Sequence, residues 1–187
     1  MNVYDLNAQR RTVRKFTQEP IAEDFLKKLV DAARVCPSAA NLQPLRYRIV
    51  SGKTACDALF PHLRWAGYLS NGAPREQERP TAYIIVAQDM NARPVESSYD
   101  IGAAMMTMTL CAQEAGIGCC WFGSIDRAAL SQMYQLDASL QIKLILALGY
   151  PAQKSVADTI TDGNLRYWLD SAQTLHVPKH KLENVLF

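Results

Sequence analysis

The sequence predicts an α+β fold in which helices surround a mixed β-sheet. Three observations carry this prediction: the 187 residues are about one domain in length, no repeat or Gly/Ser linker divides them, and runs with helix and strand spacing alternate along the chain. Hydrophobic residues make up 49% of the chain and charged residues 20%, which is typical of a globular protein with a substantial core. We therefore expect residues 1–187 to form a single domain.

Helical spacing is clearest in three stretches. Apolar side chains recur at helical intervals from Ile21, with acidic residues in the first turn, so a helix is expected over about 22–35. Residues 100–114 are apolar almost all round, which predicts a buried central helix. Asp126 is a suitable N-cap for a further helix that extends to about residue 134.

Strand-like runs alternate with these helices. Short β-branched, aromatic or continuously apolar runs predict strands at residues 47–50, 82–86, 119–122 and 142–148. Residues 151–187 hold few periodic patterns and cannot form a core alone. We expect them to form an arm that wraps the domain or a partner subunit.

Charge and cysteine content exclude several classes of protein. Twenty basic and eighteen acidic side chains give a net charge of +2, too small to favour nucleic acid or an anionic membrane as a partner. The first ten residues are polar, unlike a signal peptide. The five cysteines form no CxxC pair and no set with histidine at zinc spacing. We therefore expect a cytoplasmic protein with reduced thiols and no metal site.

Two basic segments could bind an anion. RRTVR at residues 10–14 concentrates guanidinium groups beside a hydroxyl, and VPKHKL at residues 177–182 would direct two lysines the same way if extended. Each segment could equally be a solvated basic surface. The candidate anion ligands are Arg10, Arg11, Thr12, Arg14, Lys179 and Lys181.

Two further segments could line a planar ligand. PSAANLQP at residues 37–44 offers hydroxyl and amide groups on a loop fixed by prolines, although an ordinary turn has the same composition. GIGCCWFGSID at residues 116–126 follows a helix and lacks GxGxxG, so it is no Rossmann motif, and its aromatic residues could simply belong to the core. The candidate contacts are Pro37, Ser38, Ala39, Asn41, Gln43, Trp121, Phe122, Gly123 and Ser124.

The four segments, the small-residue helix after Asp100 and LGYP at Leu148 together resemble the nitroreductase family of FMN-dependent oxidoreductases, when they are taken in their order along the chain. The resemblance implies that the two basic segments bind the FMN phosphate. It implies a homodimer with active sites at its interface and an exchanged C-terminal arm. The 37–43 loop would line the flavin of the other subunit, and residues 121–124 would lie beside the ring.

The resemblance also identifies positions where this chain departs from the family or leaves a role open. Many members carry glycine where this chain has Ala39 and Ala40. The side chain that contacts the edge of the flavin ring is expected within residues 63–78, where Arg64 and Asn71 are the candidates.

The activity implied by the resemblance is hydride transfer from NAD(P)H, with electrons passed to a small acceptor such as a nitroaromatic or a quinone. Because the flavin carries this chemistry, we expect no catalytic side chain. With no second nucleotide motif, donor and acceptor should use one flavin face in turn, which predicts ping-pong kinetics. The alternative is a non-catalytic flavin-binding or regulatory module that does not react with the donor.

Overall fold

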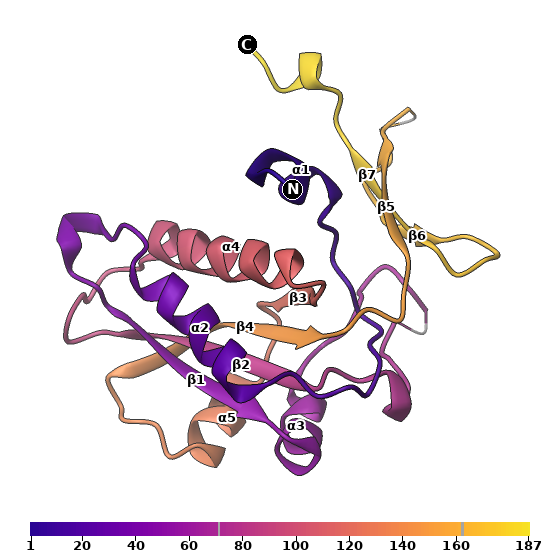
Figure 1. Ribbon diagram of the computed structural model, residues 1–187. Coiled ribbons are helices and arrows are strands. Elements are labelled where there is room, and N and C mark those ends of the chain that lie inside the picture. The colour runs from indigo at the N-terminus through magenta and orange to yellow at the C-terminus, as the bar shows by residue number, and fades with distance from the viewer. Residues whose placement is uncertain (71, 162) are drawn as a thin grey trace.

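The structure is a computed structural model that describes residues 1–70, 72–161 and 163–187. Its central sheet has the strand order β1, β2, β4, β3, and neighbouring strands are antiparallel (Figure 1). The strands are β1 Leu45–Ser51, β2 Ala82–Asp89, β3 Gly118–Phe122 and β4 Leu140–Gly149. At the outer edge of β3, Thr12 forms an isolated parallel bridge with Cys119.

Helices cover both faces of this sheet. Figure 1 shows α4 above the sheet and α3 and α5 below it, and α2 packs with α4 on the same face. The helices of the two layers are α2 Glu23–Arg34, α4 Ser98–Glu114, α3 Lys53–Leu59 and α5 Arg127–Met133. Strand β2 contributes to both layers of the core, because Ile84 faces one hydrophobic cluster and its neighbours Tyr83 and Ile85 face the other. The sheet therefore separates two apolar layers, as an α+β fold requires.

The elements expected over α2, α4, α5 and the four central strands are confirmed within a few residues at each end. Asp126 is the N-cap of α5, and its side chain accepts a hydrogen bond from the backbone N–H of Ala129 at 3.1 Å. Helix α4, however, is not buried all round. It packs Met105 and Met108 into the core, while Gly102 and Met106 on its outward face remain partly exposed.

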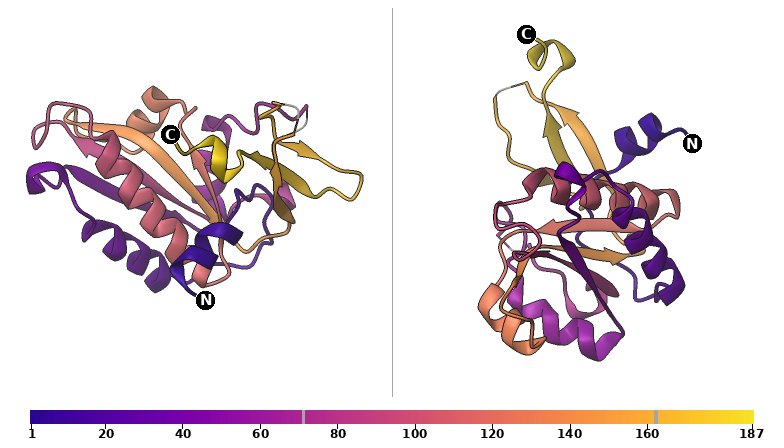
Figure 2. Two further views of the ribbon diagram at one scale, coloured as in Figure 1. Left: turned by 90° about the horizontal axis from the view of Figure 1, so that it is seen from above. Right: turned by 90° about the vertical axis from the view of Figure 1, so that its left-hand side faces the viewer.

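The C-terminal arm has more regular structure than its sequence indicates. It forms a second sheet in the order β5, β7, β6, with β5 and β7 parallel. The strands are β5 Ser155–Thr159, β6 Trp168–Leu169 and β7 Leu175–Lys179. Figures 1 and 2 show this sheet projecting beside α1 (Val3–Gln9), with the C-terminus beyond the body of the molecule.

The N-terminal segment that follows α1 packs tightly across the ends of the central strands. A Cβ atom on Gly149 would lie 2.8 Å from the Phe16 side chain, and one on Gly118 would lie 2.9 Å from Val13. Glycine is therefore required at both positions for this close approach. In residues 1–70, 72–161 and 163–187, no helix is long and apolar enough to cross a membrane.

Candidate functional site

The N-terminal basic segment lies along the outer edge of β3. The backbone N–H of Val13 donates to the carbonyl oxygen of Cys119 at 3.0 Å, next to the bridge between Thr12 and Cys119. This pairing extends the edge of the sheet and fixes the direction of the segment. Arg10 follows α1 as its C-cap, so the cluster begins where that helix ends.

The three arginines of this segment have no carboxylate within ion-pairing distance among the described residues. Arg11 folds back and donates through Nη2 to the carbonyl oxygen of Ala8 at 2.6 Å. Burial, and then the neighbouring charge of Arg10, lower the pKa of Arg11. Among the residues that the structure describes, the buried Nε atoms of Arg10 and Arg11 have no hydrogen-bond partner. Unpaired cations with unused donors are suited to a multivalent anion such as a phosphate.

Arg14 contacts two segments that are distant in sequence. Its guanidinium lies 4.5 Å from the ring centroid of Tyr167 in the arm, and that ring packs against Tyr68 with a centroid distance of 5.0 Å. Sequence analysis missed both tyrosines, because an isolated aromatic residue in an irregular stretch gives no pattern. Arg14 and Lys15 also line a polar pocket of about 410 Å³ together with Leu175 at the start of β7.

The end of β3 directs its two aromatic side chains to opposite faces of the sheet. Trp121 is 40% exposed and donates through Nε1 to Oγ1 of Thr109 on α4 at 2.8 Å. Phe122 is buried, with its ring centroid 4.5 Å from that of Trp65. Trp121 therefore remains accessible to a ligand, whereas Phe122 belongs to the core.

The turn after β3 brings the 63–78 region beside the predicted ring site. The backbone N–H of Arg64 donates to the carbonyl oxygen of Ser124 at 3.1 Å. Asn71 lies outside the described residues. Within the described part of the chain, the backbone N–H groups of Gly123 and Ser124 meet no acceptor. They are therefore available to hydrogen-bond the polar edge of a planar ligand.

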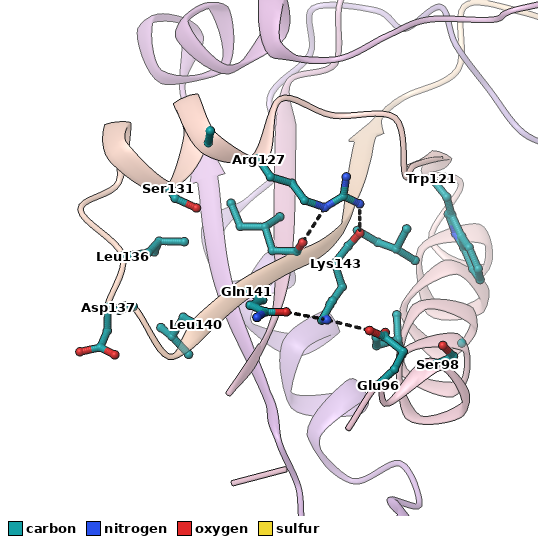
Figure 3. A pocket seen from close by; sticks show the side chains of 16 residues that line it. Glu96, Ser98, Trp121, Arg127, Ser131, Leu136, Asp137, Leu140, Gln141 and Lys143 are labelled. Carbon is teal, nitrogen blue, oxygen red and sulfur yellow. Dashed lines mark hydrogen bonds and ion pairs between the residues drawn. The ribbon is translucent and has the colours of Figure 1, made fainter. Parts of the chain in front are cut away.

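A pocket of about 790 Å³ opens beside this turn, between α4, α5 and the first half of β4 (Figure 3). Strand β3 pairs with residues 145–149 of β4, so in the described part of the structure residues 140–144 have no strand neighbour on this side. Arg127 covers the gap by donating to the carbonyl oxygens of Gly123, Ile142 and Lys143 at 3.0, 3.0 and 3.1 Å. Trp121 lines the same pocket, which joins it to the end of β3.

The two cysteines of β3 do not supply a nucleophile. Cys119 and Cys120 point into opposite layers of the core. Burial raises the pKa of the Cys119 thiol and raises that of Cys120 to about 11, although Arg14 lies close to the latter. Both thiols are therefore protonated near neutral pH and poorly reactive.

The 37–44 loop lies at the opposite end of α4 from the basic segment. Ser38 donates to Asp100 in the first turn of α4, whereas Val13 packs at Gly118, just beyond the end of this helix. From Asp100 to Glu114, the helix rises about 21 Å. One chain therefore does not bring Asn41 or Gln43 to its own Arg10 and Arg14.

The lysines of the arm are also separated from the N-terminal arginines. Leu175 lines the pocket that contains Arg14, but Lys179 ends β7 four residues further on, about 13 Å along the strand. Lys181 follows beyond the strand and lies 4.0 Å from Glu183. Within one subunit, the structure thus brings together the N-terminal segment and the β3 turn, and leaves the loop and the two lysines elsewhere.

Comparison with known proteins places this chain among relatives assigned as nitroreductases, together with one assigned as a deiodinase. It is 26% identical over 153 residues to a protein of Archaeoglobus fulgidus assigned as NADH dehydrogenase/NAD(P)H nitroreductase, covering 76% of this chain and 81% of that protein. It is also 25% identical over 166 residues to an iodotyrosine deiodinase of Thermotoga neapolitana, covering 80% and 88%.

Solved structures agree with this placement. A Desulfovibrio desulfuricans protein, assigned as a nitroreductase and crystallised with FMN, is 30% identical, with a TM-score of 0.67 and coverage of 82% of this chain and 88% of that one. An FMN-dependent nitroreductase of Clostridium difficile shares the fold at 19% identity, with a TM-score of 0.69 and coverage of 81% and 88%. A model of the nitroreductase family matches residues 8–150, so the chain belongs to the nitroreductase family.

Proposed function

We propose that this protein is an FMN-dependent oxidoreductase that takes a hydride from NAD(P)H and passes electrons to a small acceptor such as a nitroaromatic or a quinone. The observation that carries the proposal is the set of unpaired arginines along the edge of β3 in a chain of the nitroreductase family. The 30% identical relative crystallised with FMN supports the choice of cofactor.

The residues along β3 fit such a cofactor. Arg10, Arg11, Thr12 and Arg14 would hold the phosphate, and the orphaned Nε atoms of Arg10 and Arg11 supply unused donors. From Cys119, which pairs with Thr12, to Gly123 is about 13 Å of extended strand. The free N–H groups of Gly123 and Ser124 would then face the polar edge of the ring, with Trp121 nearby.

A homodimer would complete the site. The outward face of α4 carries the small or apolar residues Gly102, Ala103, Met106 and Leu110, all partly exposed. A two-fold axis near the middle of α4 would set two copies of this helix antiparallel. The loop at the start of one α4 would then meet the basic segment at the end of the other. Pro37, Ser38, Ala39, Asn41 and Gln43 would line the partner's flavin, while an exchanged arm would bring Lys179 and Lys181 to a phosphate.

None of the described site residues is an activated nucleophile or base. The flavin would therefore supply the chemistry, and the protein would bind and orient it. When bound, FMN supplies hydride acceptance and electron transfer. This chain's arginines bind the phosphate, its backbone N–H groups orient the ring, and Trp121 contributes an apolar wall. Because donor and acceptor would share one open face, each must leave before the other binds.

The decisive experiment begins with the absorbance spectrum of the purified protein, which should show bound flavin. Anaerobic addition of NADH or NADPH should bleach it, whereas a non-catalytic flavin-binding module would stay yellow. Initial rates at varied donor and acceptor concentrations should then give parallel double-reciprocal lines. Intersecting lines would mean that both substrates bind together, which contradicts the shared face.

A further inference from the structure

The carboxylate of Asp100 is buried at the start of α4, and its hydrogen bonds go to the 37–44 loop. Only 6% of the residue is exposed. Ser38 Oγ donates to Oδ2 at 2.7 Å, and the backbone N–H of Ala39 donates to Oδ1 at 3.3 Å. No lysine, arginine or histidine among the described residues forms an ion pair with it. A buried carboxylate without a cation depends on such hydrogen bonds and on the nearby helix N-terminus.

Ser38 transmits this contact to the far side of the loop. Its hydroxyl donates its single proton to Asp100 and accepts a hydrogen bond from the backbone N–H of Gln43 at 3.0 Å. Asp100, Ser38 and Gln43 are therefore linked by a continuous hydrogen-bond network across the base of the loop, which we call the clamp. The Ser38 hydroxyl uses its proton in this clamp and cannot also donate it to a ligand.

The loop that the clamp closes has a strained backbone. Ala40, Asn41 and Gln43 have φ values of +50°, +54° and +47°, in the left-handed region that non-glycine residues rarely adopt. Such a conformation persists only where surrounding contacts impose it, and it often marks a functional segment.

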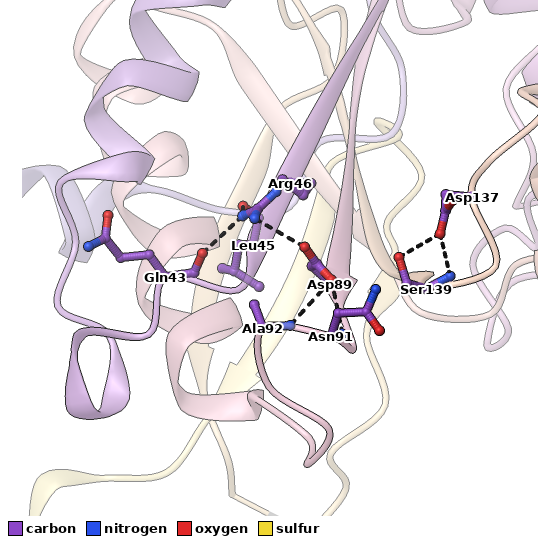
Figure 4. Close-up of polar contacts among 8 residues, drawn as sticks. All are labelled: Gln43, Leu45, Arg46, Asp89, Asn91, Ala92, Asp137 and Ser139. Atoms are coloured by element: carbon purple, nitrogen blue, oxygen red, sulfur yellow. Dashed lines mark hydrogen bonds and ion pairs between the residues drawn. The ribbon is translucent and has the colours of Figure 1, made fainter.

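A second anchor holds the end of the same loop. Arg46 donates through Nη1 to the carbonyl oxygen of Gln43 at 2.9 Å and through Nη2 to Asp89 at 3.1 Å (Figure 4). Asp89 in turn accepts hydrogen bonds from the backbone N–H groups of Asn91 and Ala92. The loop is thus fixed on one side by Asp100 and on the other by Arg46.

These two anchors leave the side-chain amides of Asn41 and Gln43 on the outer surface of the loop. Gln43 Nε2 donates to Asn41 Oδ1 at 3.1 Å, and both side chains are exposed. We propose that Asp100 is a positioning residue that, through Ser38, holds the strained loop so that Asn41 and Gln43 face the flavin of a second subunit. This inference rests on the proposed function for its flavin, while the clamp itself is a property of the loop.

The test uses the full-length protein with four substitutions. Asp100→Asn removes the charge, and Ser38→Ala breaks the hydrogen-bond network. Ser38→Thr keeps the hydroxyl on a backbone that suits a β-branched residue, and Asp24→Asn is the matched control. Asp24 is an exposed partner of Lys27 in the first turn of α2, at the opposite end of that helix from the loop. Hydrogen exchange of the Ala39 and Gln43 amides reports the clamp, and FMN affinity reports its use.

Asp100→Asn and Ser38→Ala should each speed exchange of these amides roughly tenfold or more and weaken FMN binding by roughly tenfold. Ser38→Thr and Asp24→Asn should leave both measurements within about twofold of the original protein. Restoration by threonine separates positioning from a general loss of folding. If Asp100→Asn does not fold, the alanine and threonine variants of Ser38 still decide the question.

Unchanged exchange in Ser38→Ala would overturn the clamp. Faster exchange with unchanged FMN affinity would overturn its role at the flavin while leaving the proposed function intact. A protein that binds no FMN would instead fail the proposed function and with it the flavin-directed role, which the exchange data distinguish from a missing clamp.

Discussion

Arg14 combines an available charge with a stacking contact, so its two roles can be separated by substitution. Arg14→Ala should weaken FMN binding by about 1.5 to 3 kcal/mol, because it removes a charged hydrogen-bond partner from the phosphate. Tyr167→Phe keeps the ring beneath the guanidinium and should change affinity little. Lys27→Ala removes a surface cation paired with Glu23 on α2 and serves as the control. Fluorescence titration with FMN measures all three. Equal affinity in Arg14→Ala would show that the phosphate lies elsewhere.

Ala39 and Ala40 are adjacent, but glycine should have opposite effects at the two positions. Ala40 has a φ of +50°, a conformation that costs an L-residue about 1 to 2 kcal/mol, so Ala40→Gly should raise the melting temperature. Ala39 has no positive φ, and Ala39→Gly should lower stability by about 0.5 to 1 kcal/mol through chain entropy. Thermal unfolding of the two variants tests the difference in sign. A loss of stability in Ala40→Gly would contradict the strain.

At the scale of elements, the arm sheet is held by a polar cluster across its three strands. His176 on β7 lies between Asp158 on β5, at 2.6 Å from Nδ1, and Asp170 beyond β6, at 3.2 Å from Nε2, and it stacks on Trp168. The hydrogen bond to Asp170 has the largest effect and raises the pKa of His176. Burial opposes it, and the hydrogen bond to Asp158 and the charges of both carboxylates raise the pKa further.

This cluster predicts a pH dependence of the arm. Because the pKa of His176 is raised on folding, its contribution to stability is complete below the ordinary histidine value of about 6.5 and is lost as pH rises through the folded value. An NMR titration should place the His176 midpoint above 6.5, and Asp170→Asn should lower it. Amide exchange in β7 should accelerate with pH beyond the intrinsic rate. A midpoint at or below 6.5 would contradict the cluster.

The same elements explain what sequence could and could not predict. Helix α2 and strand β2 were predictable because each repeats an apolar pattern over many residues. Strands β5, β6 and β7 were not, because β6 has two residues and the sheet is joined by polar contacts and a parallel pairing between distant segments. Asp100 gave no local signal for its role, since an acid in a first helical turn is ordinary and Ser38 lies 62 residues away.

At the scale of the whole molecule, the proposed dimer makes each site depend on two chains. The C-terminal residues Val185, Leu186 and Phe187 are exposed and find no apolar cover in one subunit. Deleting the residues after Val177 should therefore release both the partner and the flavin, because it also removes Lys179 and Lys181. Sedimentation velocity and the flavin absorbance of the same samples measure the two losses. A flavin-loaded monomer, with or without the tail, would contradict the shared site.

The unpaired first half of β4 has a consequence for how the protein behaves at high concentration. A bare strand edge invites pairing with another chain and so promotes aggregation. Arg127 occupies two carbonyl oxygens of that edge, at Ile142 and Lys143, and places a charge over them. Arg127→Ala should therefore increase light scattering on storage or mild heating. Arg127→Lys keeps the charge but lacks the guanidinium that donates to both carbonyl oxygens, so its scattering should be intermediate. One guanidinium thus contributes to colloidal stability where the sheet is left open.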